Sequence, residues 1–121
     1  MMVRHDIVNL HNRVDGAAFE KFMKDELIPF FSEHYKGPTR ASIADLKGQA
    51  FLKDTRHAQR YLWITVWSGS PEAVRGSSFE GTRMTRIEGT DAMLAKLAVF
   101  GSRPAESVFD GLAEVQVPTN T

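Results

Sequence analysis

Residues 60–67 constrain the fold of this chain more than any other stretch. They are mostly β-branched or aromatic and include no Gly or Pro, which predicts a β-strand. Side chains alternate across a strand, so this one has an aliphatic face and an aromatic face. The two sets are Leu62, Ile64, Val66 and Tyr61, Trp63, Thr65, Trp67. We expect helices to cover the aliphatic face, and a small-molecule pocket or a subunit interface to cover the aromatic one.

A strand and a long helix are predicted before this stretch. Residues 3–14 alternate, with Val8 and Leu10 on one face, and predict the first strand. Asp15 is placed to cap a helix that spans residues 16–35. Its apolar residues recur at helical spacing: Phe19, Phe22, Met23, Leu27, Phe30 and Phe31. Pro29 lies inside this pattern, so we expect a kink there or an end to the helix near Ile28.

The remaining elements follow from turn and cap residues. Residues 40–52 predict a strand with a bulge at Gly48, and the short connector 53–59 makes it an antiparallel neighbour of the central strand. Ser70 and Pro71 open one helix. Another begins at Thr90 and ends at Gly101. Residues 105–117 predict the last strand.

The resulting order is β-α-β-β-α-β, the ferredoxin-like arrangement of the α+β class with an antiparallel sheet. We expect one domain spanning residues 1–121, with helices on one face of the sheet. The other face would be half apolar, and a surface of that kind should not face water. A second copy of the sheet is the expected cover.

Composition excludes several classes of function. Lys and Arg balance Asp and Glu at 15 each, which gives no support for a nucleic-acid or membrane partner. The chain has no cysteine, so thiolate metal sites and thiol nucleophiles are excluded. No His or carboxylate cluster has the spacing of metal ligands, and we expect no metal. Without a signal peptide or a membrane-length apolar run, a cytoplasmic location is expected.

The central strand and the helix start after it carry a family resemblance. The matching residues are Ile64-Thr65-Val66-Trp67, then Ser70-Pro71-Glu72-Ala73, then Phe79. They resemble the antibiotic biosynthesis monooxygenase family of the dimeric α/β-barrel superfamily. The motif is short, although the order of elements extends the match over most of the chain. Met2-Val3-Arg4-His5 is also similar to stress-responsive members of that superfamily.

The resemblance implies a homodimer whose two sheets form a barrel, with a pocket in each subunit between sheet and helices. Some members oxidise aromatic polyketides with dioxygen and need no metal or flavin, so no cofactor is expected. Trp67 matches a pocket tryptophan of these enzymes, whereas Trp63 stands where they carry an amide. Haem-degrading members need an Asn that Asn9 matches, but residues 73–86 lack their Trp and His, and Arg83 lies near the position of that His. Haem degradation is therefore disfavoured.

Two strand residues are the candidate catalytic groups. His11 could take a proton from a phenol or 1,3-dicarbonyl, and Asn9 could hold the oxyanion that results. The alternative, which we favour, is a polar pair bonded across the sheet or the dimer interface. We further predict that His11, Asn9, Trp63 and Trp67 line one cavity for a planar aromatic ligand, since pairing the first and third strands would bring their mixed faces together.

The candidate binding residues also have plainer interpretations. Tyr61, Trp63 and Trp67 suit either a stacking platform or a dimer interface. Arg83, with Arg75 and Arg86, could clamp an enolate, but charges on a helix are more often its solvated face. Two functions stay open. One is a cofactor-independent monooxygenase acting on an aromatic or enolisable substrate. The other is a non-catalytic ligand-binding or stress-responsive dimer.

Overall fold

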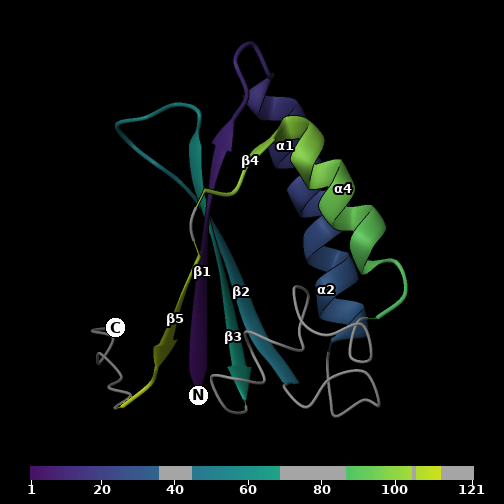
Figure 1. Ribbon diagram of the computed structural model, residues 1–121, viewed down its shortest axis with the longest axis vertical. Helices are drawn as coiled ribbons and strands as arrows, with labels where there is room; N and C mark the ends of the chain where they lie inside the picture. The colour runs from purple at the N-terminus through teal and green to yellow at the C-terminus, as the bar shows by residue number, and fades with distance from the viewer. Residues whose placement is uncertain (36–44, 69–86, 105, 113–121) are drawn as a thin grey trace, which may run out of the picture.

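The computed structural model describes residues 1–35, 45–68, 87–104 and 106–112 (Figure 1). The strands are β1 Met2–Leu10, β2 Asp45–Lys53, β3 Arg60–Ser68, β4 Gly101–Ser102 and β5 Glu106–Asp110. The helical segments are α1 Gly16–Phe22, the π-helical η1 Met23–Leu27, α2 Ile28–His34 and α4 Thr90–Phe100. None of the helices described here is long and apolar enough to cross a bilayer.

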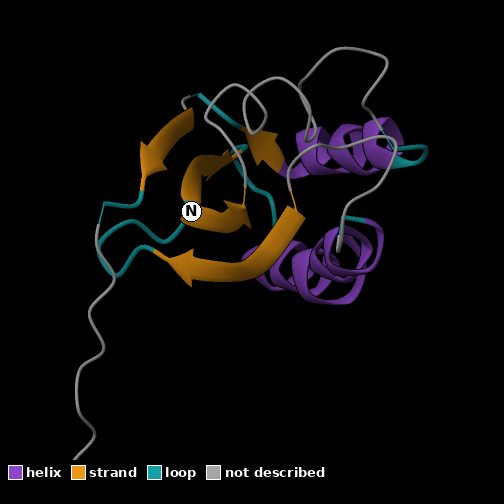
Figure 2. Ribbon diagram, turned by 90° about the horizontal axis from the view of Figure 1, so that it is seen from below, coloured by secondary structure: helices purple, strands orange, loops and turns teal. Residues whose placement is uncertain are grey.

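The strands form one antiparallel sheet in which β3 lies between β2 and β1. Both β4 and β5 pair with the other edge of β1. Figures 1 and 2 show the helices gathered on one side of this curved sheet. The α+β class, the antiparallel sheet and the bulge next to Gly48 are as the sequence predicts. The sheet therefore has a helix-covered inner face and an open outer face.

The expected assignment of the faces of β3 is wrong. Tyr61, Trp63 and Trp67 are buried under the helices, whereas Leu62, Ile64 and Val66 lie on the open face and are only half-buried. Each buried strand aromatic meets an aromatic ring from the helical layer at a steep angle. The pairs are Phe19–Tyr61 at 4.9 Å, Phe31–Trp63 at 5.0 Å and Tyr35–Trp67 at 5.8 Å between ring centroids. Edge-to-face contacts of this kind stabilise the fold in addition to the burial of apolar surface. The aromatic face of β3 therefore forms part of the core.

The long first helix contains a π-helical segment just before Pro29. Asp15 caps its start, because Ala17 N donates to the Asp15 carboxylate at 3.0 Å. Pro29 has no N–H to give the carbonyl four residues earlier, and its ring would press on that carbonyl. The N–H of Ile28 bonds instead to the Met23 carbonyl, five residues back. The helix then continues through α2 to His34, so it does not end near Ile28.

Gln49 of β2 fastens this helix to the sheet. Its Nε2 donates to the carbonyl oxygen of Ile28 and to Ser32 Oγ, both at 2.9 Å. Its Oε1 accepts the indole N–H of Trp63 at 2.9 Å. One amide thus satisfies a buried indole donor and a helix carbonyl, groups that are costly to bury without partners.

Helix α4 packs on the first helix and returns the chain to β1. Leu97 is fully buried, and Phe100 stacks on Phe22 with 5.1 Å between centroids. At Gly101 a Cβ atom would lie 2.5 Å from the Asn9 carbonyl oxygen, so only glycine allows this approach of β4 to β1. The first strand ends at Leu10 rather than at residue 14. The helix predicted at Ser70, together with residues 40–44 and 113–117 of the predicted strands, lies outside the described residues.

Candidate functional site

A buried ion pair stands on the inner face of β1. Arg4 Nε donates to Asp6 Oδ2 at 2.9 Å, and Arg4 Nη2 donates to Asp6 Oδ1 at 3.2 Å. The two side chains are 0% and 1% exposed. Removing two charges from water is costly, and their mutual attraction recovers that cost only in good geometry. Ionisable groups kept in such a place are candidates for function.

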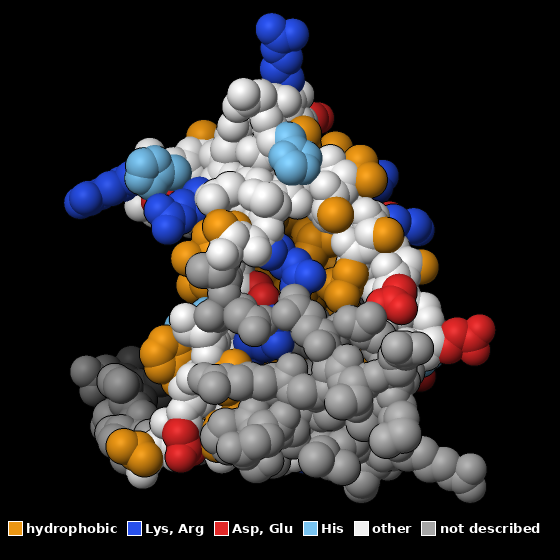
Figure 3. Space-filling model, in the orientation of Figure 1, with side chains coloured by type: hydrophobic (Ala, Val, Ile, Leu, Met, Phe, Trp, Pro, Cys, Tyr) orange, Lys and Arg blue, Asp and Glu red, His pale blue; other side chains and the backbone are white. Residues whose placement is uncertain are grey.

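Arg103 joins this pair from the segment that follows β4. Its Nη1 lies 3.6 Å from Asp6 Oδ1, and its side chain is 21% exposed. Figure 3 shows a hollow between sheet and helices in which basic and acidic side chains lie beside hydrophobic ones. Arg4, Asp6 and Arg103 together form the ion cluster. Arg4 and Asp6 are buried, and Arg103 is partly exposed.

Tryptophans and polar groups adjoin the ion cluster across the sheet. The register of β1 with β3 sets Arg4 opposite Thr65, and Asp6 opposite Trp63. The indole N–H of Trp67 donates to Thr65 Oγ1 at 2.7 Å. Guanidinium groups beside aromatic side chains are suited to a planar molecule that carries or develops negative charge. The inner face beside β1 is thus the candidate site.

The structure does not bring the four predicted cavity residues together. Asn9 is exposed on the outer face, whereas Trp63 and Trp67 are buried on the inner face. His11 lies beyond the end of β1, where its Nε2 is 3.0 Å from the Ala98 carbonyl oxygen. The prediction of one shared cavity is therefore wrong. Its cause is the register, which pairs Val8 with Tyr61 and so aligns the apolar face of β1 with the aromatic face of β3.

The other predicted site residues have separate positions. Tyr61 lies at the far end of the inner face, where its hydroxyl donates to Glu20 Oε2 at 2.8 Å. Arg83, Arg75 and Arg86 lie outside the described residues. Within the described ranges, no three His, Asp or Glu side chains are grouped as metal ligands.

Tyr61 gives a test of the inner face in alkaline solution. Burial and the hydrogen bond to Glu20 raise its pKa from 10.0 to about 12. The folded protein therefore keeps this proton after the unfolded chain has lost it. The resulting stabilisation is complete below pH 10.0 and disappears as the pH rises to about 12. Urea unfolding across this range should show a shallower loss of stability in Tyr61→Phe than in the parent, and equal slopes would contradict the assignment.

The ion cluster was not singled out by the sequence analysis, although part of its signal was present. Arg4 and Asp6 fall on the same face of the first strand as Val8 and Leu10. Charged residues two apart on an otherwise apolar strand face indicate a buried pair or a site. Arg103 gives no such local signal, because it lies almost one hundred residues away in the chain.

Comparisons with known proteins bear on the fold. No protein-family model matches the chain. No curated protein matches it either. Among solved structures, the chain is similar to SnoaB, a cofactor-independent oxygenase from Streptomyces nogalater, with a TM-score of 0.66 and 15% sequence identity. The match covers 94% of this chain and 95% of that one, so over nearly its whole length this chain shares its fold with a cofactor-independent oxygenase.

Proposed function

We propose that this protein is a cofactor-independent monooxygenase that holds an aromatic or enolisable substrate against the inner face of its sheet. The observation that carries the proposal is the ion cluster beside Thr65 and Trp67. The chain shares its fold with a cofactor-independent oxygenase, so oxygenation without a cofactor is the first reaction to test.

In the proposed reaction, the substrate supplies all four electrons that reduce dioxygen. A base removes a proton from an activated CH₂ group, and the carbanion donates an electron pair to dioxygen, which forms a C–O bond. Return of the proton gives a hydroperoxide, and loss of water leaves a ketone, so that R–CH₂–R′ + O₂ gives R–C(=O)–R′ + H₂O. Arg103 would stabilise the enolate oxygen, and the buried Arg4–Asp6 pair would hold Arg103 in place. Trp67 is fully buried and would support the site through its hydrogen bond to Thr65.

The test is oxygen uptake with a panel of anthrones and quinols. Loss of one hydrogen-bond donor to an oxyanion lowers turnover by roughly 10²–10³-fold, and we expect at least this of Arg103→Gln. Arg103→Lys should retain part of the rate, because it keeps the charge but not the planar fork. Lys96→Gln is the matched control, since Lys96 pairs with Glu26 on the exposed helices. Equal rates in Arg103→Gln and the parent would contradict the assignment.

The roles predicted for His11 and Asn9 form a separate arm of the test. If His11 is the base, His11→Ala abolishes turnover even though its ring lies beside Ala98. If His11→Ala retains turnover, the role of His11 is structural, and its contact with Ala98 connects the end of β1 to α4. Ligand binding can be measured by quenching of Trp63 and Trp67 fluorescence. Binding without oxygen uptake would favour the non-catalytic alternative. If neither binding nor oxygen uptake is observed, the proposal is overturned.

We also propose a homodimer formed through the open face of the sheet. The aliphatic residues of β3 lie on that face half-buried, and Leu52 and Phe109 are 48% and 51% exposed. A contiguous apolar surface of this kind marks an interface. The proposed enzyme site lies on the opposite face and would stay separate from it.

A further inference from the structure

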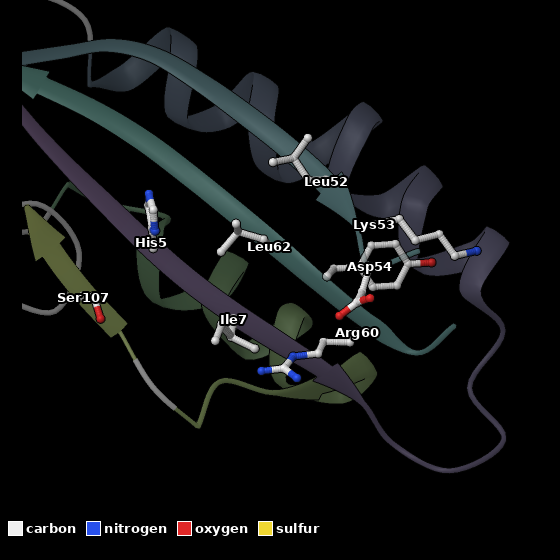
Figure 4. Close-up of a pocket in the computed structure, with 9 residues that line it drawn as sticks. His5, Ile7, Leu52, Lys53, Asp54, Arg60, Leu62 and Ser107 are labelled. Carbon is white, nitrogen blue, oxygen red and sulfur yellow. The ribbon is translucent and has the colours of Figure 1, made fainter. Parts of the chain in front are cut away.

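The open face of the sheet carries a groove of about 500 Å³, a size that accommodates a small organic molecule. Figure 4 shows Ile7 and Leu62 in its middle. Arg60 lies toward the hairpin that joins β2 to β3, and His5 lies toward the opposite end. Arg60 pairs with Asn9, which is four residues from His5 on β1, so the groove extends over about 13 Å. A molecule that fills it meets two different ends.

Two opposite charges line the hairpin end of the groove. Within the part of the chain that the structure describes, the Arg60 guanidinium makes no hydrogen bond or ion pair. Asp54 Oδ1 accepts the backbone N–H groups of Arg56 and His57 at 2.8 and 3.2 Å, and Asp54 Oδ2 takes part in none of the described hydrogen bonds. The hydrogen bond from Arg56 lowers the pKa of Asp54, so its charge is present at neutral pH. The groove thus offers a cation and a carboxylate oxygen at the same end.

A third charged residue borders this end but is engaged on the other face of the sheet. Lys53 Nζ lies 3.8 Å from Glu20 Oε2 and 5.8 Å from the centroid of the Tyr61 ring. Figure 4 shows the Lys53 side chain directed away from the middle of the groove. Arg60 and Asp54 are therefore the charges that a ligand in the groove would meet.

An apolar middle separates the charged end from a weakly polar one. Ile7, Leu52 and Leu62 line the middle, and Leu52 is 48% exposed. At the far end, Ser107 pairs in register with His5, so their side chains are neighbours on this face. A hydroxyl and an imidazole can each donate or accept one hydrogen bond there. The middle suits an apolar ring, and the far end tolerates a polar edge on it.

We propose that the groove binds an aromatic α-amino acid, with its carboxylate at Arg60, its ammonium group at Asp54 and its ring against Ile7 and Leu62. Arginine binds carboxylates through two parallel hydrogen bonds, and the free oxygen of Asp54 can accept from an ammonium group. A simple carboxylate would place its charge near Asp54 without compensation, and a simple amine would do the same near Arg60. A zwitterion satisfies both charges at once.

The amino-acid site is separate from the proposed oxygenase site, which lies on the inner face and uses other residues. Its charged end lies at the hairpin. In the proposed homodimer the ligand would enter from there, at the polar rim of the interface.

The first test is a titration followed by NMR with three related probes. L-phenylalanine carries both charges, N-acetyl-L-phenylalanine lacks the ammonium group, and L-phenylalaninamide lacks the carboxylate. We expect L-phenylalanine to bind with a Kd below about 1 mM and each derivative to bind at least about tenfold more weakly. Equal affinities for the three probes, or no binding of L-phenylalanine at about 10 mM, would overturn the proposal.

The second test uses variants of the charged end. Arg60→Gln and Asp54→Asn should each weaken L-phenylalanine binding by about tenfold or more. Asparagine can still accept the two backbone N–H groups, so Asp54→Asn removes the charge and keeps the hairpin. Arg56→Gln is the matched control, because the Arg56 side chain does not line the groove, and it should bind like the parent. Parent-like affinity in Arg60→Gln and Asp54→Asn would contradict the assignment.

The NMR titration also locates the ligand. Shift changes should gather at Ile7 and Leu62, and changes confined to the hairpin would overturn the groove as the site. Sedimentation velocity on the same samples tests the homodimer separately. A monomeric parent that binds L-phenylalanine would overturn the homodimer alone, whereas a dimer that does not bind it would overturn the amino-acid site alone.

Discussion

Replacing Asp6 with alanine is expected to lower the free energy of unfolding by about 3–5 kcal/mol, because it leaves a buried guanidinium without its carboxylate. Arg4 is 0% exposed and bonds to Asp6 through two of its nitrogens, so water cannot replace the lost partner at low cost. Urea unfolding followed by tryptophan fluorescence measures the change.

A double variant separates the ion pair from the space it fills. Arg4→Met combined with Asp6→Leu removes both charges and keeps much of the volume, and it should recover most of the stability lost in Asp6→Ala. Asp25→Ala, at an exposed position of η1, should change stability by less than about 0.5 kcal/mol. A loss below about 1 kcal/mol in Asp6→Ala would mean that this carboxylate is hydrated in solution.

Phe31→Ala is expected to cost about 3–5 kcal/mol, the range found when large buried aromatic side chains are truncated. Phe31 is fully buried, and its ring lies 5.0 Å from both Trp63 and Tyr35. Truncation to alanine would leave a cavity beside Trp63 and Tyr35. Thermal or urea unfolding of the variant gives the value directly.

The exposed Val99 gives the comparison, since Val99→Ala should change stability by less than about 0.5 kcal/mol. Ile64→Ala should cost less than Phe31→Ala, because the Ile64 side chain is only half-buried. If Ile64→Ala lowers the stability strongly and Phe31→Ala lowers it only slightly, the helices cover the aliphatic face of β3, as the sequence predicts.

Local features of the fold were predictable because their signals lie within a few residues. Asp15 could be identified as an N-cap, and Gly48 as a bulge, from residue type and position alone. The faces of β3 could not be assigned in this way, because both are apolar and the pattern of one strand does not say which side the helices take. Phe19 and Phe31 on the predicted helix were a usable hint, since they pair with the aromatic face.

The candidate site was harder to predict because it depends on contacts between distant residues. Placing His11 and Asn9 near Trp63 required the register of β1 on β3, and a shift of one residue reverses every side chain. The strand also stops at Leu10, four residues earlier than its pattern suggests. Arg4 and Asp6 could have been recognised from their strand face, whereas the approach of Arg103 to them depends on how β4 returns to β1.

The π-helical segment corrects the phase of the long helix. Its fully buried residues include a series spaced by four: Phe19, Met23, Leu27, Phe31 and Tyr35. In a regular α-helix each step of four overshoots a full turn by about 40°, so a series of this length would drift by about 160° around the axis. The wider winding of η1 takes up part of that drift in the middle of the series. A chain that wound the same stretch as continuous α-helix would have to alternate spacings of three and four to keep one line of contact with a sheet.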